Sequence, residues 1–423
     1  MLAQNIVSVT DTAFLGRVGE VELGASALGG VFYFTLYMVG FGFAGGAQIL
    51  IGRRNGERDF SQIGRLFYHT IYFLEFLGLL LSFIYLFTGP AILKLMISSD
   101  AVFEATDSYL SYRIWGIFFA FITISFRSFY VGITKTRVLG TASVILAVVN
   151  IILDYVLIFG RLGFPEMGIA GAALASTIAE GISCLYFIFA LYTRKENRLY
   201  NILKFPTVSW SMIRQIWNLS IYMMIQSFAS VGVWFGFFMI IEQTGEQPLA
   251  VSNIIRSFYM LITMPLWAFH TATNTLVSNA MGEGKTESVI PIAFKVTKFS
   301  FYVTLVSSAV VCLIPEYIIK IYTTDKELIN EAIPIVYLIS AAILFWSVLH
   351  NFYSVISGSG NTRTSLFIEL ITLGFYMAYV YVVAIAFRSS LLWIWSAEIV
   401  YIIILGGISI LYLKTGKWKY KQI

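Results

Sequence analysis

Charged side chains are scarce in this chain, and their scarcity excludes a soluble domain. Asp, Glu, Lys and Arg make up 12% of the 423 residues, whereas soluble domains carry roughly 25%. Histidine occurs three times and cysteine twice, without the spacing of a metal site. These absences argue against a metalloenzyme or another membrane-embedded enzyme. We therefore expect neither catalytic activity nor a bound cofactor.

Apolar side chains take the place of the missing charge. The chain is 58% hydrophobic, with a mean hydropathy of +0.80. Its apolar runs are too long for barrel strands of about ten residues and suit membrane helices of about twenty. We predict an all-α polytopic membrane protein with twelve transmembrane helices. The runs cover residues 1–17, 25–52, 64–88, 108–132, 138–160, 168–192, 212–241, 249–280, 290–322, 332–356, 365–387 and 391–413.

Lysine and arginine are distributed unevenly between the loops that this layout creates. One side holds 19 of them and the other holds 7, Arg113 among these, while Arg127 and Arg256 fall inside helices. Positive loops stay in the cytoplasm, so we expect both termini there and a multi-pass protein of the plasma (inner) membrane. The basic tail should meet anionic lipid headgroups, and nothing requires nucleic acid as a partner.

The chain divides into two similar halves. A shift of 226 residues puts Gly56-Glu57 on Gly282-Glu283 and Thr136-Arg137 on Thr362-Arg363. With six runs in each half, the halves share one orientation, which is the parallel-repeat design of several secondary transporters. We expect two six-helix lobes around a central cavity in a monomeric protein. The predicted parts are an N-terminal lobe (1–192), a cytoplasmic linker (193–211), a C-terminal lobe (212–413) and a basic tail (414–423).

Acidic residues inside apolar runs are the strongest functional signal. A carboxylate at the centre of a membrane helix costs about 2.5–3.5 kcal/mol on insertion scales. Asp11 lies in the first run, and Asn150 and Asp154 share one face of the fifth because they are four residues apart. At the 226 shift their counterparts are Phe237, Tyr376 and Val380. The first half alone therefore carries this set.

Such a cluster favours cation binding. Two carboxylates close together in a medium of low dielectric repel each other, and a bound H⁺ or Na⁺ relieves the repulsion. Carboxylate, amide and hydroxyl oxygens suit a hard cation. We therefore expect a coupling site for Na⁺ or H⁺, with Na⁺ held by Asp11, Asn150 and Asp154. Binding there would shift the first helix and reshape the cavity.

Further polar residues could complete this site or line a substrate cavity. Ser176 and Thr177 lie on the sixth run beside Glu180, and Gln4 shares a face of the first run with Asp11. In the second half the candidate cavity residues are Gln226, Asn253, His350 and Asn351. Structural roles remain open for several of them. Asn150 could bond a neighbouring helix, and the hydroxyls of the sixth run could serve close helix packing.

Several motifs resemble the multidrug and toxic compound extrusion (MATE) family, within the wider polysaccharide and drug flippase superfamily. The resemblance covers essentially the whole chain. It is carried by Asp11-Thr12-Ala13-Phe14-Leu15-Gly16-Arg17, by Gly56-Glu57 and Gly282-Glu283, by Thr134-Lys135-Thr136-Arg137 and Gly360-Asn361-Thr362-Arg363, and by Gly171-Ala172-Ala173-Leu174-Ala175-Ser176.

The resemblance implies an antiporter that exports small organic compounds, often cationic, in exchange for Na⁺ or H⁺. It also implies a first-lobe cation site at Asp11, Asn150, Asp154 and Ser176, with Thr177 as the alternative hydroxyl, and a substrate contact at Gln4. Some members carry further acids on helices 7 and 10. The nearest positions here are Gln226 and Trp346, neither of which is acidic.

A second function stays open, that of a flippase for a lipid-linked glycan or cell-wall precursor. Such a protein would need a groove lined by Arg and Lys that face pyrophosphate. Only Arg127 and Arg256 are expected inside the membrane, so drug export is the preferred interpretation.

Overall fold

The computed structural model describes residues 2–202 and 204–423. Helices occupy nearly all of the described chain, and no strand occurs among those residues. Ten helices are long and apolar enough to cross a membrane, or eleven if the bent pair α4 and α5 forms one span. Helix α1 is 17 residues long and is not among these ten. The predicted all-α polytopic fold is confirmed.

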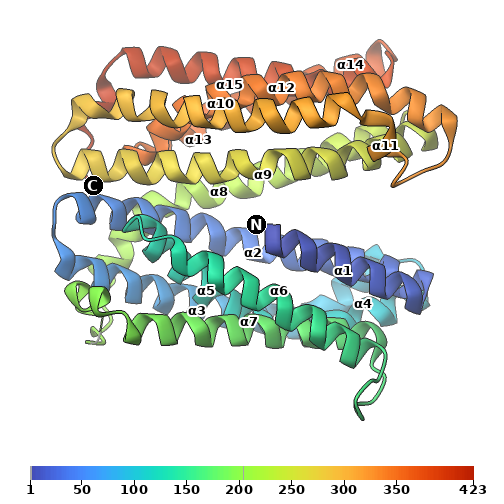
Figure 1. Cartoon of the computed structure of the whole chain (residues 1–423), viewed down its shortest axis with the longest axis horizontal. Coiled ribbons are helices and arrows are strands. Elements are labelled where there is room, and N and C mark those ends of the chain that lie inside the picture. Colours follow the sequence, from blue (N-terminus) through green and yellow to red (C-terminus); the bar gives the residue numbers. More distant parts are fainter. Residues whose placement is uncertain (1, 203) are drawn as a thin grey trace. The chain divides into compact units, whose positions relative to one another are not determined.

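Contacts divide the chain into two compact units, Met1–Met224 and Ile225–Ile423. Figure 1 colours the helices by position, from blue for α1 to red for α15. The boundary falls within α8 (Trp210–Glu242). The first unit holds α1 (Leu2–Val18), α2 (Glu20–Gly56), α3 (Phe60–Met96), α4 (Asp100–Arg113), α5 (Gly116–Gly132), α6 (Arg137–Ile158), α7 (Gly168–Thr193) and the short helix η1 (Lys195–Tyr200).

The second unit is also built mainly of long helices. A five-residue π-helix, η3 (Val382–Ala386), extends α13. The other elements are α9 (Glu246–Gly282), η2 (Thr286–Ser288), α10 (Val289–Leu313), α11 (Pro315–Ile319), α12 (Lys326–Gly358), α13 (Thr362–Tyr381), α14 (Leu391–Trp395), α15 (Ala397–Lys414) and η4 (Lys417–Tyr420).

The fourth predicted span, 108–132, is the one that the structure alters most. Ser99 caps the N-terminus of α4 by accepting a hydrogen bond from the Val102 amide, so the helix starts well before the apolar run. The chain then bends by 51° between α4 and α5. The polar composition of α4 hid it from a search for apolar runs.

Glycine lets two helices of the first unit approach at backbone distance. A Cβ at Gly171 on α7 would lie 2.7 Å from the carbonyl oxygen of Leu157 on α6. Real side chains do not tolerate that distance, so glycine is what permits this contact. The close approach brings the polar face of α6 against the first turns of α7.

Candidate functional site

Two aspartates from different helices meet in the first unit. Helix α1 packs against α6, and Asp11 and Asp154 are near enough to interact electrostatically. Asp154 is completely buried and Asp11 is partly buried. Two carboxylates that are close together and shielded from water repel each other. The two acids grouped by the sequence analysis are therefore neighbours in the fold.

The oxygens of this cluster lack donors. Among the described residues, no N–H or O–H group donates to Asp11 Oδ1, to either Asp154 carboxylate oxygen or to Asn150 Oδ1. Buried acceptors are ordinarily satisfied. Four unsatisfied oxygens from three side chains therefore indicate a place where a proton or a hard cation would bind.

Asn150 connects this cluster to α7. Its Nδ2 donates to Ser176 Oγ over 3.2 Å. Its carbonyl oxygen, Oδ1, has no donor among the residues described and remains available to a cation. No three His, Cys, Asp or Glu side chains gather as a metal site in the described part of the chain. Coordination of Na⁺ here would therefore require the amide and hydroxyl oxygens as well as the two carboxylates. That donor set is all oxygen and fits Na⁺ by chemistry.

Thr177 and Glu180 belong to a neighbouring network. Thr177 donates its hydroxyl proton to the Tyr112 carbonyl over 3.3 Å. Arg113 holds Glu180 by two bonds, Nη2 to Oε1 at 2.6 Å and Nη1 to Oε2 at 2.8 Å. Tyr33 adds a hydroxyl donor at 3.3 Å, and its ring lies 3.7 Å from the guanidinium carbon. A bidentate pair of this kind is geometrically specific.

The assignment of Arg113 to a loop on the outer side is wrong. Arg113 is buried in the last turn of α4, where it pairs with Glu180. The predicted run 108–132 already contained Arg113, but the charge count placed this residue with the loops. Arg113 is thus a buried cation within a helix, whereas Arg127 is half-buried and Arg256 is exposed.

The remaining candidate cavity residues do not form one described cluster. The side chain of Gln4 lies outside the described part of the structure, and Gln226 is half-buried on α8. Asn253 is exposed on α9 and donates to the Leu249 carbonyl over 3.0 Å. Asn351 is buried, accepts from Thr273 at 3.0 Å and donates to the Ser347 carbonyl at 2.7 Å. Both asparagines therefore bond within or between neighbouring helices.

His350 does have a histidine neighbour, although the sequence spacing suggested none. The rings of His270 and His350 are 4.7 Å apart, one on α9 and the other on α12. The rings of Trp267, Trp346 and Tyr353 surround His350. Helix packing brings together positions that are far apart along the chain.

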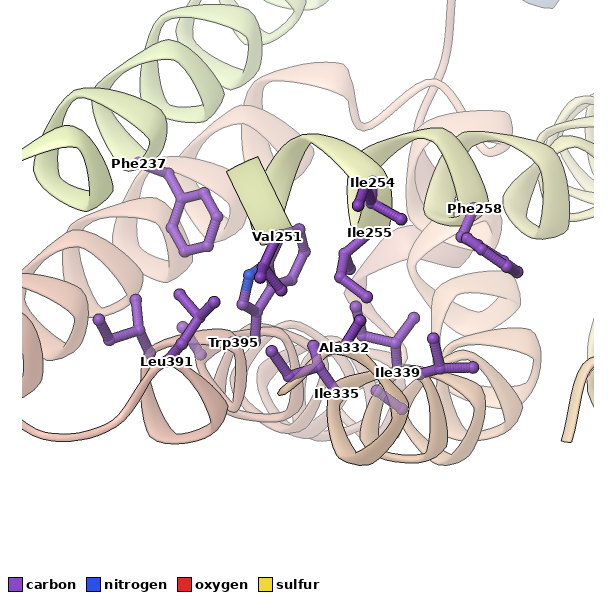
Figure 2. Close-up of a cluster of buried hydrophobic side chains, with 14 of the residues drawn as sticks. Phe237, Val251, Ile254, Ile255, Phe258, Ala332, Ile335, Ile339, Leu391 and Trp395 are labelled. Carbon is purple, nitrogen blue, oxygen red and sulfur yellow. The ribbon is translucent and has the colours of Figure 1, made fainter. Parts of the chain in front are cut away.

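The second-half counterparts of the acidic cluster form an apolar core. Phe237, Tyr376 and Val380 all belong to one buried hydrophobic cluster, and the Phe237 and Tyr376 rings are 5.8 Å apart. Figure 2 shows Phe237 facing the side of the cluster that holds Trp395 and Leu391. The internal repeat thus matches the helices that carry Asp11, Asn150 and Asp154 with helices that pack through an apolar core at the same positions.

Sequence reasoning missed two buried acids in the second half, Glu369 on α13 and Glu398 on α15. Both lie in apolar runs, the same signal that identified Asp11. Glu398 also occupies a repeated position, since Ala397-Glu398 matches Ala179-Glu180 at a shift of 218 residues.

The fold is that of a multi-pass membrane transporter. One solved structure, described as the outward-facing conformation of a multidrug resistance MATE family transporter of the MOP superfamily, matches 100% of this chain and 94% of its own, with a TM-score of 0.91. The eukaryotic MATE transporter AtDTX14 matches 99% and 93%, with a TM-score of 0.84. Both are 18% identical in sequence, so this likeness concerns the fold.

The chain belongs to the MatE family, as the predicted resemblance required. The family's sequence model matches residues 1–156 and 220–382. A probable multidrug resistance protein NorM of Thermotoga maritima is 24% identical over 422 residues, which cover 99% of this chain and 90% of the relative. Another, of Rhizobium meliloti, is 24% identical over 404 residues, or 93% and 86% of the two chains.

Proposed function

We propose that this protein exports small organic compounds across the inner membrane in exchange for Na⁺ or H⁺, by alternating access. The observation that carries the proposal is the proximity of Asp11 to Asp154, with three of their four oxygens lacking a donor. The relatives named as multidrug resistance proteins support organic, often cationic or amphipathic, substrates. The basic loops support cytoplasmic termini.

Cation binding at this cluster would favour one conformation of α1. Helix α1 ends at Val18 and packs on α6 and α2. A change in the repulsion between Asp11 and Asp154 would therefore act directly on the contact between α1 and α6. A 100-fold preference of the ion for one conformation corresponds to about 2.7 kcal/mol. Repulsion between two carboxylates in a medium of low dielectric is of that order.

Two of the cations inside helices are poorly placed for the flippase alternative. It needs cations that are available to pyrophosphate, whereas the newly recognised buried cation, Arg113, has both terminal nitrogens engaged by Glu180. Arg127 lies against the Phe41 ring at 4.8 Å. We therefore keep organic-compound export as the function and lipid-linked glycan transport as the alternative.

Efflux of ethidium from proteoliposomes, with Na⁺ and pH gradients imposed separately, tests the proposal. We expect one of the two gradients to drive efflux and Asp11→Asn to abolish that dependence while leaving protein yield intact. Glu104→Gln, an exposed acid on α4, is the matched control. Efflux that is independent of both gradients, or gradient-driven efflux that persists in Asp11→Asn, would contradict the proposal of ion-coupled export through Asp11.

A further inference from the structure

The second unit buries two glutamates that the proposed coupling site does not use. Glu369 on α13 is 2% exposed and Glu398 on α15 is 4% exposed. An acid so deeply buried in a membrane bundle requires compensation, either by a cation or by loss of its charge.

Glu369 is surrounded by hydroxyl groups from three other helices. Its Oε1 accepts from Ser230 on α8 at 3.0 Å and from Tyr401 on α15 at 2.8 Å. No group among the described residues donates to its Oε2. The carboxyl group therefore presents one saturated oxygen and one that accepts nothing.

Tyr353 on α12 lies near Glu369, but its hydroxyl donates to the Ser365 carbonyl at 3.1 Å. Glu369 Oε2 therefore has no donor among the described residues. A buried carboxylate with one unpaired oxygen is costly. A carboxyl group that carries a proton fits these surroundings better.

Glu398 has the same kind of neighbours. It accepts from Tyr259 on α9 at 2.8 Å and from Tyr376 on α13 at 3.0 Å. The rings of Tyr376 and Tyr401 are 6.1 Å apart. These two tyrosines join the glutamates into one network.

No cation forms an ion pair with either glutamate among the described residues. On α12 itself, the His350 ring lies 5.5 Å from the Tyr353 ring, and His270 of α9 lies beside His350. Arg363, on the same helix as Glu369, stacks on Phe367, and Arg256 of α9 lies over Phe238. Glu180, which matches Glu398 in the repeat, has the guanidinium of Arg113 instead. The two halves thus compensate corresponding acids by different means.

We propose that Glu369 is a proton-binding site of the second half, and that its hydroxyl network, Tyr353, Tyr401 and Ser230, holds the neutral carboxyl between proton uptake and release. Uptake converts the carboxylate to the acid, and release returns the proton to water when the site is hydrated. This inference deepens the proposed function, since it gives the export cycle a proton that does not pass through Asp11.

Infrared spectroscopy of the whole protein in lipid bilayers tests this site without any transport substrate. A protonated carboxyl has a carbonyl band separate from that of a carboxylate. Other buried carboxyl groups absorb in the same region, so the test compares variants. We expect Glu369→Gln to remove one component of this band at neutral pH, and Glu327→Gln, which replaces an exposed acid on α12, to leave the band unchanged. The component that belongs to Glu369 should vanish and return as the pH is raised and lowered.

A second variant distinguishes the loss of the proton-binding site from misfolding of the protein. Tyr401→Phe removes one hydroxyl donor from Glu369 and should displace the same component without abolishing it. A band unchanged by Glu369→Gln would overturn the proposal, and so would a component that never titrates while the protein stays folded. Failure of the first-half coupling site would appear separately, as gradient-driven efflux that persists in Asp11→Asn.

In proteoliposomes, Glu369→Gln should lower the number of protons exchanged per ethidium by about one while retaining the dependence on Asp11. An unchanged proton count would overturn the link to transport.

Discussion

Asn150 donates from Nδ2 to Ser176 Oγ over 3.2 Å, so the amide that borders the aspartate pair is fixed from a neighbouring helix. The close approach of Gly171 to Leu157 brings α6 and α7 together at backbone distance. The orientation of a proposed ion ligand thus depends on a contact made outside the cluster. This arrangement is typical of sites in which outer groups orient the ligands.

Removing this bond should weaken ion binding without abolishing transport. A hydrogen bond of this kind contributes about 0.5–1.5 kcal/mol, so Ser176→Ala should raise the half-saturating ion concentration for efflux up to about tenfold. The double variant Asn150→Ala/Ser176→Ala should be less impaired than the sum of the single changes. Full additivity would show that the two side chains act independently.

The Arg113–Glu180 pair should be costly to break and easy to replace. Arg113→Met leaves the partly buried Glu180 without its cation, and loss of one partner of a buried pair costs at most about 3–5 kcal/mol. Arg113→Met/Glu180→Met should recover most of that loss. Thermal unfolding in detergent measures both effects, and a double variant no more stable than Arg113→Met would contradict this account.

Helix α2 should be sensitive to side-chain size at one end and insensitive at the other. A Cβ at Gly46 would collide with the Ser220 hydroxyl and lie 2.7 Å from its Cα, whereas a Cβ at Gly24 meets nothing within 4 Å. We expect Gly46→Ala to lower stability by about 1–3 kcal/mol. Gly24→Ala, on the same helix, should leave the unfolding temperature unchanged or raise it slightly.

Protons should compete with Na⁺ at the aspartate pair. A cation can occupy the four oxygens only when Asp11 and Asp154 have given up their protons. As the pH falls, the Na⁺ concentration needed for half-maximal efflux should therefore rise, while the rate at saturating Na⁺ stays constant. Efflux from proteoliposomes at several pH values provides the measurement. A fall in the saturating rate with unchanged half-saturation would show that protons act elsewhere.

Much of the helical framework could be predicted because apolar runs and their polar borders are local features. The run 138–160 became Arg137–Ile158, and 168–192 became Gly168–Thr193. The 51° bend between α4 and α5 could not be predicted, because it depends on packing rather than on composition. The environment of Glu369 was beyond sequence reasoning, since Ser230 lies 139 residues away and Tyr401 lies 32 away.

The neutral pairing of Arg113 with Glu180 has an electrical consequence. Because their opposite charges lie side by side, a movement of both through the membrane field transfers almost no net charge. Asp11 and Asp154 have no such partner at bonding distance, so the voltage would act mainly on them and on the ion they bind. Transfer of one elementary charge across the whole field corresponds to about 2.3 kcal/mol per 100 mV. The resting potential of the cell would then set the direction of export together with the chemical gradients.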